Sequence, residues 1–220
     1  MSLTSDSANS GLADVTDAVS SFSCMRNQDV ENFLQYNSVR FEKSDITRTY
    51  LIIDQKQFEN NKTINIVAYF SLSLKILVLP DLLSNRKTKM IDGFSKDAKE
   101  AIVYLIGQLG KNDMYSDDID GREILHRALN IISDIQNSIG GRVVLVECED
   151  NENLLDFYKN NGFEILPEYR ENDILISIKD LLPENRENFS PFLKAISEIV
   201  AIHEENNNIN DNLLQLIKFI

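Results

Sequence analysis

The 220-residue sequence lacks the features that mark secreted and membrane-bound proteins. Its two cysteines, Cys24 and Cys148, lie far apart, and we expect free thiols rather than a disulfide framework. No stretch approaches the roughly 20 consecutive apolar residues that a membrane-spanning helix needs. Residues 1–21 also lack the basic-then-apolar order of a secretory signal. These absences predict a soluble, cytoplasmic protein.

Basic residues and histidines are also scarce. The 22 lysines and arginines stand against 35 aspartates and glutamates, which gives a net charge of −13. Because nucleic acids are bound mainly by lysine and arginine, this charge argues against a nucleic-acid partner, although one local basic pocket is compatible with it. A cationic acceptor, such as an amine or a basic peptide, suits the balance better. His126 and His203 have no cysteine or carboxylate at a telling spacing, and packing or solvated roles are expected for both.

The first third of the chain predicts a helix and a β-hairpin. Residues up to about 20 carry no periodic apolar pattern and are interpreted as a flexible arm. A helix is expected after Asp29, its predicted N-cap. The β-rich runs 49–53 and 64–74, joined by a short polar turn, predict an antiparallel hairpin. Residues 75–99 are interpreted as an excursion, helical in part, on the acceptor side.

The centre of the sequence is the most informative part. Residues 101–109 form a continuous apolar run, as expected of a strand that is buried on both faces. From Gly121 onwards, apolar residues recur every three or four positions, which predicts an amphipathic helix that ends at Gly140. Residues 142–148 form a second apolar strand. Strand, helix and strand in this order predict a right-handed parallel crossover.

Shorter elements complete the pattern. Residues 151–160 predict a helix, and 163–166 and 174–178 predict two short strands. Two further helices are expected at about 189–204 and 211–220. We therefore expect three parts along the chain: a flexible N-terminal arm over 1–21, a main domain over 22–182, and a C-terminal helical extension over 183–220.

Three motifs in the main domain resemble the GNAT superfamily of acetyl-CoA-dependent N-acetyltransferases. Asn151 is followed by Tyr158 and by Gly162-Phe163, similar to the family's Asn–Tyr–Gly-Phe helix and turn. Gln108-Leu-Gly-Lys, a loop and Gly121 are similar to its coenzyme A motif, and the segment 141–147 resembles its channel-forming strand. The resemblance implies a mixed α/β fold: a mostly antiparallel sheet with a central splayed parallel strand pair, flanked by helices.

The resemblance also implies an activity and residues that carry it. Acetyl-CoA would be the cosubstrate, and its acetyl group would pass to a primary amine by direct attack in a ternary complex. Tyr158 would be the acid that reprotonates the departing thiolate. Glu147 is the predicted base, with Glu149 as the reserve, although a solvated carboxylate or a water-mediated route is equally compatible. The predicted cofactor-binding residues are Gln108, Leu109, Gly110, Lys111, Ser116, Gly121, Arg122 and Asn151, of which the main-chain N–H groups of residues 109–111 are the oxyanion candidates.

The expected phosphate loop departs from the family pattern. The helix that begins at Gly121 would attract phosphate through its free N–H groups, but an ordinary N-terminal glycine is also possible there. Between Ser116 and Gly121 lie three aspartates, which should repel a pyrophosphate while Lys111 and Arg122 offset part of the charge. The same loop partly fits a calcium-binding pattern, but its twelfth position is Arg127 rather than glutamate, so no metal is predicted.

Two other functions stay open from the sequence. One is a degenerate acetyl-CoA-binding or protein-interaction module without turnover. The other is a toxin-like acetyltransferase that acts on charged transfer RNA, which the net negative charge disfavours. The predicted C-terminal helices could dock on a second copy and form a homodimer. The identity of the acceptor amine is not encoded in any motif of this sequence.

Overall fold

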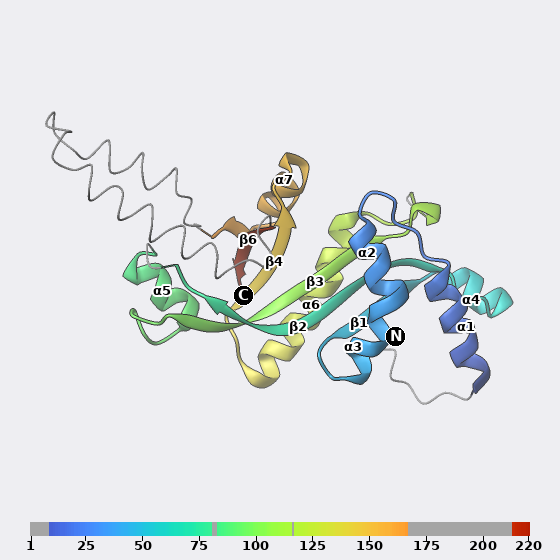
Figure 1. The fold of residues 1–220 in the computed structure, drawn as a ribbon, viewed down its shortest axis with the longest axis horizontal. Coiled ribbons are helices and arrows are strands. Elements are labelled where there is room, and N and C mark those ends of the chain that lie inside the picture. Colours follow the sequence, from blue (N-terminus) through green and yellow to red (C-terminus); the bar gives the residue numbers. More distant parts are fainter. Residues whose placement is uncertain (1–8, 81–82, 116, 167–212) are drawn as a thin grey trace, which may run out of the picture.

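A six-stranded mixed sheet is the framework of the protein (Figure 1). The structure is a computed structural model that describes residues 9–80, 83–115, 117–166 and 213–220. The strands lie in the order β1-β2-β3-β4-β6-β5. Strands β3 and β4 are parallel, while every other neighbouring pair is antiparallel. This arrangement confirms the predicted fold class, a mostly antiparallel sheet with one central parallel pair.

The first half of the chain supplies two strands and most of the helices. Its elements are α1 (Asn9–Ser20), α2 (Gln28–Asn32), the π-helical turn η1 (Phe33–Asn37), α3 (Ser38–Lys43), β1 (Arg48–Ile53), α4 (Gln55–Asn61) and β2 (Ile66–Val78). The antiparallel pairing of β1 and β2 confirms the predicted hairpin. Its connection, however, contains α4 rather than a short polar turn.

Two predictions near the N-terminus are wrong. Residues 9–20, expected as part of a flexible arm, form α1, and Ala18 and Val19 at its end are buried. The N-cap of α2 is Asn27 rather than Asp29, because the Asn27 side chain accepts hydrogen bonds from the N–H groups of Asp29 and Val30. Val30, in α2, belongs to the buried cluster that also contains Ala18 and Val19 of α1.

The second half of the described chain builds the rest of the sheet. Its elements are α5 (Asn85–Asp92), β3 (Glu100–Lys111), the 3-10 turn η2 (Asp113–Tyr115), α6 (Gly121–Ile139), β4 (Val143–Glu149), α7 (Glu152–Asn160), β5 (Glu164–Ile165) and β6 (Leu213–Phe219). The predicted order of strand, helix and parallel strand corresponds to β3, α6 and β4. The strand predicted at 174–178 and the helix predicted at 189–204 lie outside the described residues.

The helix predicted at 211–220 is wrong, because Leu213–Phe219 forms strand β6 between β4 and β5. The leucines of this segment also fit the alternation of a strand. Leu214 and Leu216 belong to one core cluster, while Ile217 belongs to the cluster on the other side. Antiparallel pairing along the whole of β4 therefore decides the conformation.

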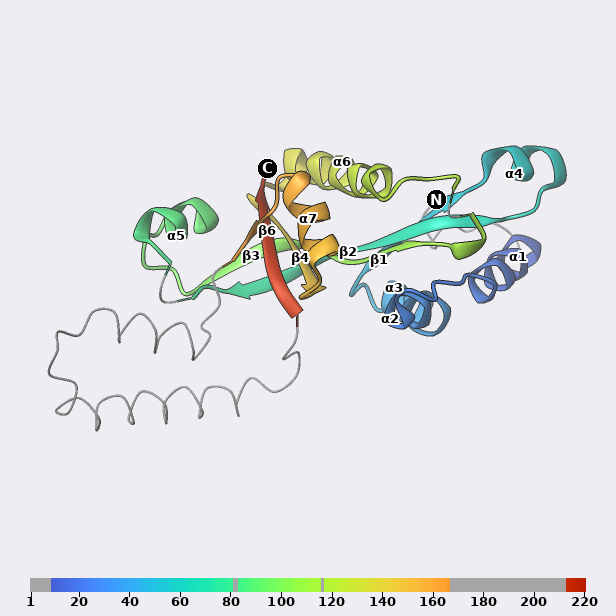
Figure 2. The same ribbon diagram turned by 90° about the horizontal axis from the view of Figure 1, so that it is seen from above.

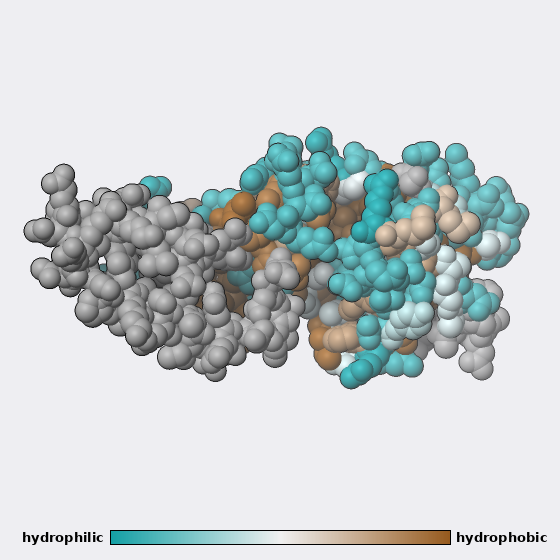
Figure 3. Space-filling view, turned by 45° about the horizontal axis from the view of Figure 1, so that its top comes forward, coloured by the Kyte–Doolittle hydropathy of each residue, from teal (hydrophilic) through white to brown (hydrophobic). Residues whose placement is uncertain are grey.

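Helices cover both faces of the sheet (Figure 2). We call the face that packs on α6 and α7 the α6 face; its buried cluster includes Ile124, Leu125 and Tyr158. On the opposite face, α1, α2 and α3 cover the β1–β2 end, where Phe22 and Tyr69 are buried. Figure 3 shows hydrophilic residues gathered over the end that carries these helices, and hydrophobic residues toward the middle of the molecule. Among the described residues, no helix is long and apolar enough to span a membrane.

Candidate active site

The parallel strands β3 and β4 separate part-way along their length. They pair only over Tyr104–Ile106 and Val144–Val146. Beyond that point, residues 107–111 of β3 pair with β2, and residues 147–149 of β4 pair with β6. Peptide groups of a strand point alternately to its two sides, so part of the β3 backbone beyond Ile106 faces the space that β4 leaves.

Gly107 marks the point of separation. The register between β2 and β3 shifts there, because Ser71 pairs with Gln108 while Leu72 pairs with Ile106. A β-bulge bends its strand and increases the local twist, which turns β3 away from β4. Gly107 is exposed although it lies in a central strand. Gly107 is not among the predicted site residues, although a glycine inside an apolar strand run is a known signal of a bulge.

Tyr158 extends from α7 toward the separated part of β4. It is 8% exposed and lies in one cluster with Val146 and Cys148 of β4. Its ring packs edge-on against Phe157 and Phe163, with centroid distances of 5.1 and 5.5 Å. Burial, with a smaller contribution from the neighbouring Cys148 thiol, raises the pKa of Tyr158 to about 12. The hydroxyl is therefore protonated at neutral pH and can donate a proton.

The four predicted residues on β3 lie beyond the point of separation, but they differ in their surroundings. Gln108 and Leu109 are half-buried. Gly110 is buried against α2: a Cβ atom there would overlap a Val30 methyl group and lie 2.8 Å from a ring carbon of Tyr69. Close packing therefore accounts for this glycine. Lys111 ends the strand and is half-buried.

The N-terminus of α6 is already capped by a carboxylate. Asp120 is the N-cap, and its Oδ1 accepts a hydrogen bond of 3.2 Å from the N–H of Arg122. Gly121 follows as the first helical residue, and a Cβ atom there would lie 3.6 Å from the ring of Phe157. This approach brings the start of α6 next to α7. The Arg122 side chain is exposed, and Ser116 lies outside the described residues.

Asn151 caps α7. Its Oδ1 accepts hydrogen bonds of 3.0 and 3.4 Å from the N–H groups of Asn153 and Leu154. An asparagine at this position satisfies orphan donors of the first turn and fixes where the helix begins. The contacts that the structure provides for Asn151 are thus those of a helix cap, which orients Tyr158 two turns later.

Comparison with known proteins bears on this arrangement. No protein-family model matches the sequence, and no curated protein does so significantly. The structure is similar to that of AtaT complexed with acetyl-methionyl-tRNAfMet, with a TM-score of 0.56 and 23% identity over 70% of this chain and 84% of that one. A tyrosine-to-phenylalanine mutant of KacT gives a TM-score of 0.55 at 17% identity, over 69% of this chain and 82% of that one.

A third similar structure, AtaTR bound with acetyl-CoA, has a TM-score of 0.53 and 22% identity over 70% of this chain and 81% of that one. AtaT and KacT are toxins with the fold of GNAT acetyltransferases. The chain has the GNAT fold. At identities this low, the structural similarity shows a shared fold and nothing about the chemistry of individual residues.

Glu147, the predicted base, is held by two partners in this GNAT fold. Both of its carboxylate oxygens lie 2.7 Å from the Nζ of Lys75, and Oε1 also accepts a hydrogen bond of 2.9 Å from the Nε2 of Gln215. Neither partner was predictable from a local motif, because Lys75 and Gln215 come from strands far apart in the chain. Glu149, the reserve, is exposed at the end of β4.

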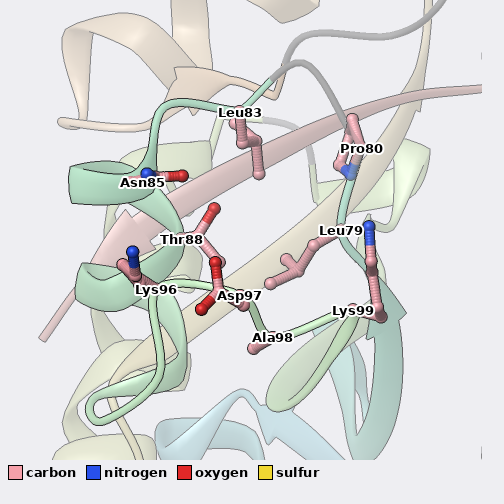
Figure 4. A pocket seen from close by; sticks show the side chains of 9 residues that line it. All are labelled: Leu79, Pro80, Leu83, Asn85, Thr88, Lys96, Asp97, Ala98 and Lys99. Atoms are coloured by element: carbon pink, nitrogen blue, oxygen red, sulfur yellow. The ribbon is translucent and has the colours of Figure 1, made fainter.

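A hollow of about 120 Å³ lies elsewhere in the GNAT fold (Figure 4). It is lined by Leu79, Pro80, Leu83, Asn85, Thr88, Lys96, Asp97, Ala98 and Lys99, beside α5 and away from α7. It therefore does not coincide with the separation of β3 and β4. Within the described ranges, no group of three or more histidine, cysteine or carboxylate side chains is placed to hold a metal ion.

Proposed function

We propose that the protein is an N-acetyltransferase that transfers the acetyl group of acetyl-CoA to a primary amine in a ternary complex. The observation that carries this proposal is the separation of β3 and β4 after three paired residues, with Tyr158 beside the separated part of β4. A thioester arm that lies between the two strands can meet backbone N–H groups on one side and a phenol on the other. AtaTR, a protein of the same fold, binds acetyl-CoA.

The proposed reaction needs only one side-chain proton donor. The amine nitrogen attacks the acetyl carbonyl carbon, and N–H groups of the β3 backbone between residues 107 and 111 stabilise the oxyanion. The C–S bond then breaks, and the sulfur of coenzyme A takes a proton from the Tyr158 hydroxyl. The attacking amine loses its proton to water or to a neighbouring base. Because the pKa of Tyr158 is about 12, the phenol returns to its protonated form after each turnover.

The diphosphate of acetyl-CoA would lie where α6 begins. Gly121 allows close approach of the backbone, and Arg122 and Lys111 supply positive charge. Asp120 opposes binding of the diphosphate, because its negative carboxylate lies at the same helix start, where it accepts a hydrogen bond from the Arg122 N–H. We therefore propose that this chain binds acetyl-CoA through the thioester arm at least as much as through the diphosphate.

Calorimetry and a thiol-release assay test the proposal together. Wild-type protein should bind acetyl-CoA and release coenzyme A when a suitable amine is present. Tyr158→Phe should lower kcat by about 100-fold, the size of a general-acid contribution, and leave the affinity for acetyl-CoA unchanged. Phe157→Leu, beside it on α7, is the matched control for packing. No binding at high micromolar acetyl-CoA would support the degenerate module instead.

A second candidate function is acetylation of an amine carried by RNA. Residues 84–99, around α5, carry five lysines and arginines and two aspartates, against a net charge of −13 for the whole chain. Arg86, Lys89 and Lys96 are exposed there, and the neighbouring Phe94 is 89% exposed. Phosphates and unstacked bases bind such a combination of cations and an aromatic ring.

AtaT, a protein of the same fold, is complexed with acetyl-methionyl-tRNAfMet. The local positive charge around α5 weakens the expectation, based on net charge, that no nucleic acid is bound. Aminoacyl-tRNA and the corresponding free amino acid should therefore be compared as acceptors. A preference for the free amino acid by kcat/KM would reject RNA as the carrier.

A further inference from the structure

Three polar side chains connect three strands on the face of the sheet opposite Tyr158. Val146 and Cys148 belong to the core cluster that contains Tyr158, so Glu147 between them points to the other face. There it meets Lys75 of β2, at 2.7 Å, and Gln215 of β6, at 2.9 Å. The Lys75 and Glu147 side chains are 33% and 16% exposed, so the ion pair is partly shielded from water.

The ion pair crosses the short stretch where β3 and β4 are paired: Lys75 pairs with Val103, just before it, and Glu147 lies just beyond it. Strand β3 lies between β2 and β4, so the Lys75 side chain reaches Glu147 across β3. The last paired residue of β4 is Val146, and Glu147 comes directly after it. At this position the β3–β4 distance is no longer fixed by backbone hydrogen bonds. The Lys75–Glu147 contact joins β4 to β2 next to this position.

The same contacts engage the carboxylate oxygens that a base would have to present to the amine. Both carboxylate oxygens face one lysine ammonium, and Oε1 has a further donor in Gln215. Charge-assisted hydrogen bonds in a partly buried site are strong and geometrically specific. An incoming amine would have to displace Lys75 before it could transfer a proton to Glu147. Glu147 is thus better suited to hold β4 in place than to act as a base.

We propose that Lys75 and Gln215 are positioning residues that hold Glu147, and through it β4, at the separation from β3 that admits the acetyl-thioester arm of acetyl-CoA. This inference rests on the proposed function. In this role Glu147 affects the KM for acetyl-CoA and takes no part in proton transfer. Lys75 acts from the far face of the sheet and does not touch the reacting atoms.

Charge-swap variants distinguish this role from that of a base. Lys75→Met and Glu147→Gln should each raise KM for acetyl-CoA by about tenfold, within the range of coupling between contacting residues, and leave kcat within about twofold of wild type. The double variant Lys75→Glu with Glu147→Lys restores the ion pair with reversed charges and should bring KM most of the way back to the wild-type value. Lys75→Arg keeps the charge and should behave like wild type. Lys56→Met, an exposed lysine on α4, is the control.

The outcomes separate the positioning role from the proposed function. A charge-swap variant as impaired as the single variants, or a large loss of kcat in Glu147→Gln, overturns the positioning role while acetyl transfer stands. Wild-type protein that neither binds acetyl-CoA in calorimetry nor releases thiol overturns the proposed function itself, and this inference with it. Thermal unfolding of each variant shows whether it is folded, and Lys75→Arg tests the ion pair even if Lys75→Met does not fold.

Discussion

Asp120 is the residue at which helix stability and ligand binding compete. As the N-cap of α6 it satisfies the Arg122 N–H, and an anionic side chain there also complements the positive end of the helix dipole. The same negative charge would lie beside the diphosphate of acetyl-CoA. One residue thus stabilises the helix and weakens the site that the helix would otherwise form.

Replacing Asp120 with serine should tighten binding of acetyl-CoA. Serine keeps the N-cap, so stability should change by less than about 1 kcal/mol, while removal of the charge relieves repulsion of about 1 kcal/mol. We expect Kd to fall about fivefold in calorimetry at low salt, and the gain to shrink as salt screens the charge. Asp134→Asn, further along the same helix, is the control. An unchanged or weaker affinity would show that the diphosphate does not meet the start of α6.

Replacement by alanine should affect stability differently at the two glycines of the predicted coenzyme A motif, Gly110 and Gly121. A Cβ at Gly110 overlaps Val30 and Tyr69, so Gly110→Ala should destabilise the fold by about 1–3 kcal/mol in urea denaturation. A Cβ at Gly121 makes an ordinary 3.6 Å contact with Phe157, so Gly121→Ala should leave stability nearly unchanged. If Gly121 lies against the diphosphate, that variant should weaken acetyl-CoA binding. Equal stability of the two variants would contradict the packing described for Gly110.

At the scale of elements, β6 holds the second half of the sheet together. It pairs with β4 over seven residues and with β5 on its other edge. Leu216 and Ile217 are both 0% exposed and fill the cores on opposite faces. The strand also supplies Gln215 to Glu147, so it contributes to the packing of the sheet and to the geometry of the candidate site.

Truncation of Leu216 should therefore cost as much as a mutation in the centre of the core. Leu216→Ala removes a fully buried side chain and should destabilise the protein by about 2–5 kcal/mol, measured by chemical denaturation. Ile220→Ala, at a side chain that is 37% exposed, should change stability by less than about 1 kcal/mol. Similar losses for both variants would show that β6 is not packed as the structure describes.

The sequence predicted some of these elements well and others not at all. The run 101–109 and the helix at Gly121 correspond to β3 and α6 within about two residues, because a continuous apolar run and a 3.6-residue period are local signals. The conformation of β6 depends on its partner β4, so its own leucines could not decide between helix and strand. The ion pair of Lys75 and Glu147 and the place of β6 in the sheet are long-range contacts without a local signature.

At the scale of the whole molecule, charge is unevenly distributed. The chain is strongly acidic, yet the end that carries α5 presents Arg86, Lys89 and Lys96 to solvent. Figure 1 places this end opposite the one that carries α4. An anionic macromolecule that approaches the protein would therefore be attracted to one end and repelled elsewhere, which orients it before contact.

Charge reversal around α5 tests whether that end meets RNA. The double variant Arg86→Glu with Lys89→Glu should weaken binding of transfer RNA and reduce the slope of log K against log salt by about 2, as the loss of two phosphate contacts requires. Turnover of a small amine should not change. Lys56→Glu on α4 is the control for net charge. An unaltered salt slope would exclude Arg86 and Lys89 from any RNA interface.

The position of β6 also constrains the order of events during folding. Residues 213–219 come long after β4 in the chain, yet they fill the place between β4 and β5. While the polypeptide is being synthesised, β4 has an uncovered edge until this segment has left the ribosome, and such edges promote aggregation. A nascent chain therefore cannot complete this part of the sheet, or form the hydrogen bond from Gln215 to Glu147, before residues 213–219 are available.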